Sequence, residues 1–201
     1  MKRIFFSLLA FACVTATEAQ DSTQVSVTQV TKVTFLDPGV SYERALSPKQ
    51  TLFLHGFLQT SAYFTYSSAL GSDAGVEFFP AINAQYRHYY NGDKRAAAGK
   101  RTEMNSMNYL AAMAEINLQR NDRRWNYFSP GEFHQLYTVG ALWGLQRNYP
   151  KRFSLDISLG LGYYVRSGRS TINERYNSIH KSGLTTLGKL SLGFWLNKRK
   201  D

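Results

Sequence analysis

One stretch of the chain decides the fold class: FSLDISLGLGYYVR, residues 153–166. Every second residue from Phe153 to Val165 is apolar, and most residues between them are small, polar or charged. A helix returns to the same face after three or four residues, whereas a strand does so after two. The stretch therefore predicts a β-strand with one apolar and one polar face.

The same period of two recurs in six further segments. They are 33–46, 51–66, 75–91, 107–119, 133–146 and 184–196. Strands of ordinary globular proteins average about five to six residues. Each of these segments also exceeds the ~9–11 residues with which a tilted strand crosses a bilayer. No segment has a convincing helical period, so we expect an all-β protein.

An eighth strand is expected near the N-terminus, because bacterial outer-membrane barrels have an even number of strands. We place it within 24–35, where three valines form a faint alternation. The sequence DPG at 37–39 would then be a turn, since Pro-Gly fits the middle of a type II turn. Alternatively, Pro38 lies inside one long strand and residues 20–30 are a tail.

The predicted fold class is an all-β, closed, antiparallel up-and-down transmembrane β-barrel of eight strands. We expect the barrel to span 33–198. Residues 20–32 are then an N-terminal tail or the first strand, and 199–201 form a polar C-terminal end.

The connections between the strands follow the asymmetry of outer-membrane barrels, which have short turns at one end and long loops at the other. We expect short turns at 47–50 and 147–151, and long loops at 120–132 and 167–183. The segment 92–106 departs from this rule, because it is a long connection at the short-turn end.

The first nineteen residues predict export. A basic start, an apolar run over 4–14 and small residues up to Ala19 form a secretory signal peptide, with cleavage after Ala19. A competing interpretation is a lipoprotein signal at Cys13, although the usual Leu is missing three positions before it. Cys13 is the only Cys, so cleavage after Ala19 leaves a chain without cysteine chemistry.

Composition excludes several classes of protein. Hydrophobic residues are 43% of the chain, and there are 5 Pro and one Cys, so neither a disordered chain nor a disulfide scaffold fits. The mean hydropathy of −0.35 excludes a helical membrane protein, but a barrel strand carries half its residues as polar. The net charge of +10 invites nucleic acid as a partner, which the predicted export argues against.

The polar faces distinguish a membrane barrel from a soluble, lipocalin-like barrel, whose strands also alternate. These faces consist mostly of Ser, Thr, Gly, Asn and Gln, whereas a soluble outer surface would carry more Lys and Glu. Their few charges have both signs. Because buried charges are costly unless paired, we expect a paired network that fills the lumen. Its members are Glu43, Glu77, Arg87, Glu115, Asp156, Arg166 and Lys189.

Aromatic residues on the apolar faces gather towards the strand ends, as in the two girdles at the headgroup levels of a membrane. One predicted girdle contains Tyr86, Tyr90, Trp143, Phe153 and Phe194. The other contains Phe64, Tyr66, Phe78, Tyr137 and Tyr163. The alternative is that aromatics simply favour strands.

The predicted signal peptide, the repeated strands and the ending GKLSLGFWL at 188–196 resemble the small bacterial outer-membrane β-barrel proteins. In that family the last strand ends on alternating apolar residues and an aromatic. This chain departs by continuing with NKRKD. The segments PGVSYE (38–43), YYN (89–91) and NSMNY (105–109) resemble uncharacterised Bacteroidetes-type barrels, and the layout is distantly similar to OmpA/OmpX-type and lipid A deacylase barrels.

The resemblance implies a location in the cell outer membrane. It implies outer-membrane lipids, lipopolysaccharide and the barrel-assembly machinery as partners, and a monomer. Basic residues in the predicted turns and loops suit contact with anionic headgroups. We expect a structural or surface-interaction role without catalysis. The alternatives are a lipid A-modifying enzyme and a narrow conduit for a small ligand.

Candidate chemistry is limited to one motif. His180-Lys181-Ser182 has the His-x-Ser form of lipid A deacylases, in which His180 would be the base and Ser182 the nucleophile. We place it in the predicted loop 167–183 and expect an ordinary polar loop. No pair among the four His has metal-ligand spacing, so we expect neither a metal nor a cofactor.

Overall fold

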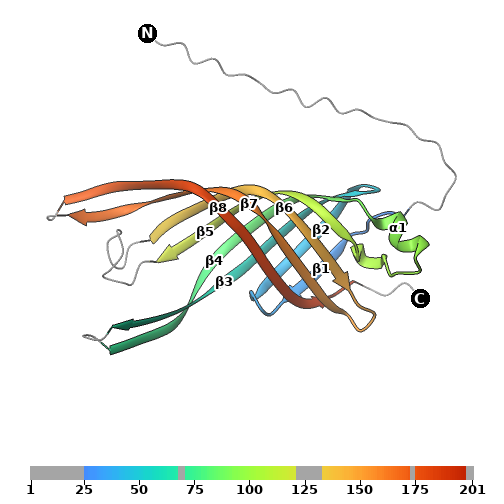
Figure 1. Ribbon diagram of the computed structural model, residues 1–201, viewed down its shortest axis with the longest axis horizontal. Helices are drawn as coiled ribbons and strands as arrows, with labels where there is room; N and C mark the ends of the chain where they lie inside the picture. Colours follow the sequence, from blue (N-terminus) through green and yellow to red (C-terminus); the bar gives the residue numbers. More distant parts are fainter. Residues whose placement is uncertain (1–24, 68–70, 121–132, 173–174, 198–201) are drawn as a thin grey trace, which may run out of the picture.

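The structure is a computed structural model, and it describes residues 25–67, 71–120, 133–172 and 175–197. The described residues form eight antiparallel strands and two short helices (Figure 1). The strands are β1 (Val30–Thr34), β2 (Gly39–Ser47), β3 (Gln50–Ser67), β4 (Gly71–Tyr89), β5 (Asn108–Arg120), β6 (Phe133–Asn148), β7 (Phe153–Ile172) and β8 (Arg175–Trp195). The helices are α1 (Gly92–Ala97) and the 3-10 helix η1 (Glu103–Asn105).

Each strand pairs with its neighbours in the sequence, and β1 pairs with β8, so the sheet closes into a barrel. This confirms the predicted all-β, antiparallel, eight-stranded closed sheet. The predicted signal peptide at 1–19 with Cys13, most of the loop 120–132 and the end at 199–201 lie outside the described residues. Within the described part of the chain, no helix is long and apolar enough to cross a membrane.

The first hairpin contains the expected eighth strand. β1 lies within the predicted window 24–35 and pairs with β2 from Val30↔Glu43 to Thr34↔Gly39. Residues 35–38 are a turn, in which Thr34 Oγ1 donates a hydrogen bond to the Asp37 carbonyl at 2.5 Å. A single strand over 33–46 was therefore wrong, because this turn interrupts it.

The last hairpin is longer than predicted. β7 and β8 stay paired from Phe153↔Phe194 to Ile172↔Arg175. The predicted loop 167–183 was therefore wrong. The residues of this segment lack an apolar alternation. The two strands nevertheless remain paired, because the backbone hydrogen bonds between them do not require apolar side chains.

The two ends of the barrel differ. At the end that carries α1, called the closed end here, all eight strands contribute to the ring. Towards the other end, called the open end, the hairpins β3–β4 and β7–β8 project and diverge, on the left of Figure 1. β1 and β8 pair only over Lys32–Thr34 and Gly193–Trp195. Within the described residues, the rest of β8 pairs with β7 alone. We call this interruption of the backbone pairing, between β8 and the β1–β2 turn, the notch.

The two faces of the sheet have opposite chemistry. Outward side chains are large, apolar and exposed, as in Ile82 at 63%, Leu159 at 59% and Leu161 at 69%. Inward side chains are buried and largely polar or charged. Inward glycines make room for larger side chains, because a Cβ at Gly144 would lie 2.7 Å from Cε2 of the buried Tyr109 ring.

A cap closes the α1 end of the barrel. It consists of residues 92–107 and 25–29. Asn105 joins the two segments, since its Oδ1 accepts from the Thr28 N–H at 2.7 Å and its Nδ2 donates to the Thr28 carbonyl at 2.8 Å. The buried side chains of Val27 and Met107 belong to one apolar cluster with Tyr89, Tyr109, Ala111 and Leu142. The long connection 92–106, which the usual asymmetry did not explain, is thus part of a structure that fills the barrel end.

A surface ion pair fastens the cap to the turn between β2 and β3. Lys49 Nζ lies 2.9 Å from Asp93 Oδ2, and the Val25 N–H donates to Asp93 Oδ1 at 3.1 Å. The Lys49 hydrogen bond and then the Val25 N–H lower the pKa of Asp93 below its ordinary value.

Candidate functional site

The deepest part of the barrel interior holds a buried ion cluster. Arg87 Nη1 on β4 lies 2.9 Å from Asp156 Oδ2 on β7, and Lys32 Nζ on β1 lies 3.7 Å from the same oxygen. Both cations also donate to Gln146 Oε1, at 2.9 Å from Arg87 and 2.7 Å from Lys32. The cluster therefore links strands on opposite sides of the barrel.

A second carboxylate completes this cluster. Glu43 Oε1 accepts from Thr51 Oγ1 at 2.7 Å and from Tyr89 Oη at 2.6 Å, and Glu43 Oε2 accepts from Gln146 Nε2 at 3.2 Å. Asp156 Oδ1 in turn accepts from Tyr109 Oη at 2.6 Å. Two cations thus meet two carboxylates, each with further donors, as burial of charge requires.

Aromatic rings hold the Arg87 guanidinium in place. Its Cζ lies 3.7 Å from the centre of the Phe53 ring and 4.2 Å from that of Tyr109. Such cation–π contacts are strongest where water is excluded, and Arg87 is buried. The packed cluster and the cap together fill the closed end of the barrel.

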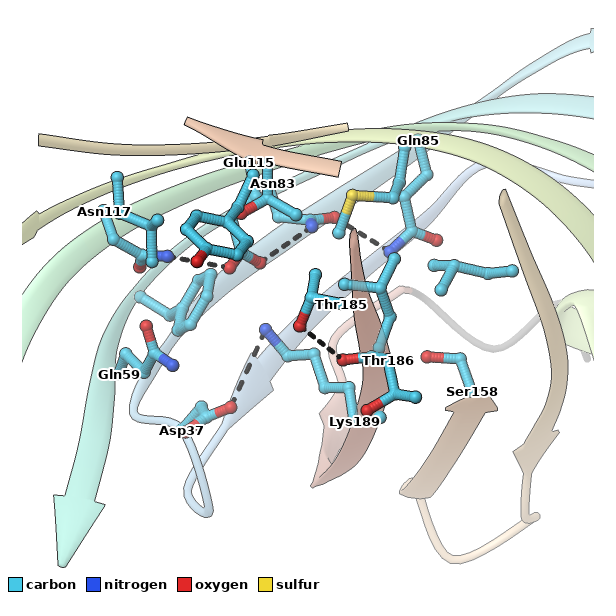
Figure 2. A pocket seen from close by; sticks show the side chains of 18 of the residues that line it. Asp37, Gln59, Asn83, Gln85, Glu115, Asn117, Ser158, Thr185, Thr186 and Lys189 are labelled. Atoms are coloured by element: carbon cyan, nitrogen blue, oxygen red, sulfur yellow. Dashed lines mark hydrogen bonds and ion pairs between the residues drawn. The ribbon is translucent and has the colours of Figure 1, made fainter. Parts of the chain in front are cut away.

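A cavity of about 340 Å³ lies between this cluster and the open end (Figure 2). Glu115 stands in its wall, where Oε2 accepts from Asn83 Nδ2 and Oε1 from Asn117 Nδ2, both at 2.9 Å. On another side, Lys189 Nζ lies 3.7 Å from Asp37 Oδ2. The cavity is thus bounded by β8 and the β1–β2 turn, which flank the notch in the wall.

The predicted lumen residues all lie on inward positions but in separate groups. Glu43, Arg87 and Asp156 belong to the deep cluster. The cavity wall holds Glu115, Arg166 and Lys189. Glu77 lies on the projecting part of β4, opposite Ser61 of β3. The structure therefore divides the single predicted network into parts at different depths.

Sequence reasoning missed five members of the deep cluster: Lys32, Thr51, Tyr89, Tyr109 and Gln146. Lys32 lies on a strand whose exact position the faint valine pattern did not give. Tyr89 and Tyr109 are neighbours on β4 and β5, and their buried hydroxyl groups both bond a carboxylate. The alternation on these strands could have indicated that both Tyr residues point inward, because both lie on the polar face.

The predicted girdle aromatics all point outward. At the closed end, Trp143 Nε1 donates to Tyr90 Oη at 2.8 Å, and the Phe153 and Phe194 rings lie 6.3 Å apart. The remaining members of that group and of the other group are exposed or half-buried: Tyr86, Phe64, Tyr66, Phe78, Tyr137 and Tyr163. Two aromatic groups thus lie at different heights on the outer surface.

The His-x-Ser motif lies on β8 rather than in a loop. His180 Nε2 is 3.3 Å from Ser167 Oγ, while Ser182 Oγ accepts from Tyr163 Oη at 2.7 Å. The base and the nucleophile of the deacylase interpretation therefore engage different partners on the outer face of the sheet.

In the interior, His55 and His134 serve as hydrogen-bonding groups. His55 Nε2 lies 3.1 Å from Thr34 Oγ1, and the His55 ring stacks on Phe57 with centres 4.5 Å apart. His134 Nε2 lies 3.0 Å from Gln119 Oε1. Among the described residues, no three His, Cys, Asp or Glu side chains are grouped so as to hold a metal ion.

In comparisons with known proteins, no family model, no curated protein and no solved structure matches this chain.

Proposed function

We propose that this chain is a small integral outer-membrane β-barrel protein with a polar interior closed at one end, and that its role is structural or in surface interaction. The observation that carries the proposal is the contrast between the two faces of the sheet. The outer face exposes a continuous set of Leu, Ile, Val and aromatic side chains, whereas the inner face buries the ion cluster. Soluble monomers rarely expose apolar patches of such extent.

The aromatic groups support this proposal. Trp and Tyr concentrate at membrane interfaces, where the ring lies in an apolar layer and the polar group reaches water. Trp143 and Tyr90 form such a polar pair at the closed end, and Tyr137 and Tyr163 are candidates for the opposite interface. The apolar residues Leu159 and Leu161 lie between these levels on β7.

The notch has a place in this proposal. A bilayer offers no partners to unpaired backbone groups, and within the described residues β8 has strand partners on β7 alone from Arg175 to Leu192. Asp37 and Lys189 flank the notch and are polar. We infer that water from the cavity, rather than lipid acyl chains, lies against this edge of β8 and hydrogen-bonds its backbone groups.

The interior argues against free diffusion of solutes. An eight-stranded barrel encloses a space just wide enough for side chains. Here the deep cluster and the cap occupy the closed end, with Asn105, Met107 and Arg87 all buried. A role as an open porin is therefore disfavoured. The projecting hairpins and the sequence positions of Arg169, Arg175 and Lys181 favour contact with lipopolysaccharide phosphates.

Three measurements test the proposal. A folded barrel should migrate faster on a detergent gel before boiling than after it, and the cellular protein should sediment with outer membranes. A single migration rate combined with recovery in the soluble periplasmic fraction would instead support a lipocalin-like barrel. In planar bilayers the purified protein should give no stable large conductance, and such a conductance would refute the closed interior.

A further inference from the structure

The cavity has the size and the construction of a small-ligand site. Its volume of about 340 Å³ falls within the ~300–1,000 Å³ of typical ligand pockets. Polar side chains from several strands converge on it, including Gln59, Asn83, Glu115 and Asn117 in Figure 2. Phe57 and Leu142 add apolar surface to the same wall.

Among the described residues that line this wall, three buried atoms have no hydrogen-bond partner: Asn117 Oδ1, Gln59 Oε1 and Arg166 Nε. Asn117 is only 2% exposed, and its Nδ2 already donates to Glu115. Buried polar atoms are normally satisfied, so each exception needs a cause. Two acceptors and one donor fit a ligand that supplies at least two donors and one acceptor.

The charges of the wall show which acceptor is needed. Glu115 already receives an amide hydrogen bond on each oxygen. Lys189 pairs with Asp37, and its Nζ lies 3.3 Å from the centre of the Phe57 ring. Within the described part of the chain, Arg166 has no carboxylate within salt-bridge distance. A carboxylate is the natural partner of a guanidinium, because the hydrogen bond is then charge-assisted.

The register brings two of these groups to the same part of the wall. Asn117 on β5 pairs with Leu136 on β6, and Leu136 pairs with Arg166 on β7. With strands about 4.8 Å apart, the backbones at Asn117 and Arg166 are therefore about 10 Å apart. All three side chains line the same cavity, and this backbone separation matches the span of one sugar-sized molecule.

We propose that the cavity binds a small hydroxylated carboxylate of monosaccharide size, a sugar acid. Its carboxylate pairs with Arg166, and its hydroxyl groups donate to Asn117 Oδ1 and Gln59 Oε1. An ammonium group would need a carboxylate partner, and the nearby Glu115 already accepts a hydrogen bond on each oxygen. Hydroxyl groups therefore fit Asn117 Oδ1 and Gln59 Oε1 better. The site is formed by interior residues alone. Its test is therefore independent of whether the outer face lies in a membrane.

The test is calorimetric titration of the purified full-length protein in detergent with D-glucuronate, D-glucose and L-serine. Glucuronate should bind, and at least about tenfold more tightly than the neutral sugar or the amino acid. Arg166→Gln should weaken glucuronate binding by about tenfold to a hundredfold and should leave the weak binding of glucose unchanged. Lys94→Gln is the matched control, because it also removes one cation but lies on the exposed cap helix α1. It should leave the affinity for glucuronate unchanged.

Gel migration before and after boiling verifies that each variant is folded. Gln59→Ala provides a second, milder variant on another strand and should also weaken glucuronate binding. No glucuronate binding up to about 10 mM would overturn the proposal. Equal binding by the wild type and folded Arg166→Gln would also overturn it. Tighter binding of serine would refute the sugar acid in favour of an amino acid.

Discussion

Arg87 and Asp156 form a buried ion pair of 2.9 Å across the barrel interior, although β5 and β6 lie between their strands in the wall. The pair therefore connects β4 and β7, which are not neighbours in the sheet and share no backbone hydrogen bonds. Lys32 approaches the same carboxylate from β1, so three strands meet at one charge.

Asp156→Asn should destabilise the fold strongly, because it leaves Arg87 and Lys32 as like charges without their buried carboxylate. Loss of one partner of a buried pair typically costs about 3–5 kcal/mol. The free energy of unfolding, measured by urea titration in detergent, tests this. The double variant Arg87→Met with Asp156→Leu should be less destabilised than Asp156→Asn. If Asp156→Asn unfolds like the wild type, the cluster contributes nothing to stability.

Gly144→Ala should destabilise the barrel, because the added Cβ would meet the Tyr109 ring. That ring has little freedom to move, since Tyr109 Oη is bonded to Asp156. Overpacking of this kind costs about 1–3 kcal/mol. Gly56→Ala is the matched control, because a Cβ there would meet no atom within 4 Å. Equal unfolding midpoints for the two variants would show that Tyr109 does not fill this position.

The notch predicts an alternating pattern of amide exchange on β8. Leu192 accepts from Phe35 with its carbonyl, so even-numbered residues of β8 direct their backbone groups away from β7. The amides of Gly188 and Leu190 should therefore exchange at least about tenfold faster than those of Leu187 and Lys189, which bond β7. Residue-resolved hydrogen exchange by NMR measures this. Uniform protection along β8 would show that another segment pairs with this edge.

The cap should loosen in acid. The pKa of Asp93 is lowered from its ordinary value of 3.8, so its contact with Lys49 stabilises the fold above that value. The contribution is lost as the pH falls through the lowered pKa. Because the pair is exposed, the loss should be about 0.2–1 kcal/mol. Asp93→Asn should remove this part of the acid dependence of unfolding. An unchanged acid dependence in the variant would mean that the contact does not hold the cap.

The sequence was sufficient for the strand segments that have an apolar face, and for the side of the sheet on which their residues lie. The alternation in 153–166 gives both, because a strand has a period of two. It was not sufficient for the partners inside the barrel. Arg87 meets Asp156 only because the sheet closes with a particular stagger of its strands, which no local pattern contains.

The misplaced segments share a physical cause. Residues 167–183 have no apolar face, so nothing in the pattern indicates that their backbones remain paired. The cap 92–107 has no period at all, because its structure depends on contacts such as Asn105 with Thr28. The cavity likewise depends on where β1 ends, since the short pairing with β8 leaves the notch beside Lys189.

Spin labelling of β7 in lipid bilayers determines whether the outer face of the barrel lies in a membrane, as we propose. Single Cys residues at Ile157, Ser158, Leu159 and Leu161, in a Cys13→Ser background, carry a nitroxide for measurement of collision rates. The outward labels at 157, 159 and 161 should collide readily with oxygen, which partitions into lipid, and rarely with a water-soluble nickel complex. The inward label at 158 should be shielded from both reagents. If the outward labels instead collide mainly with the nickel complex, the outer face lies in water, and the barrel does not reside in a membrane.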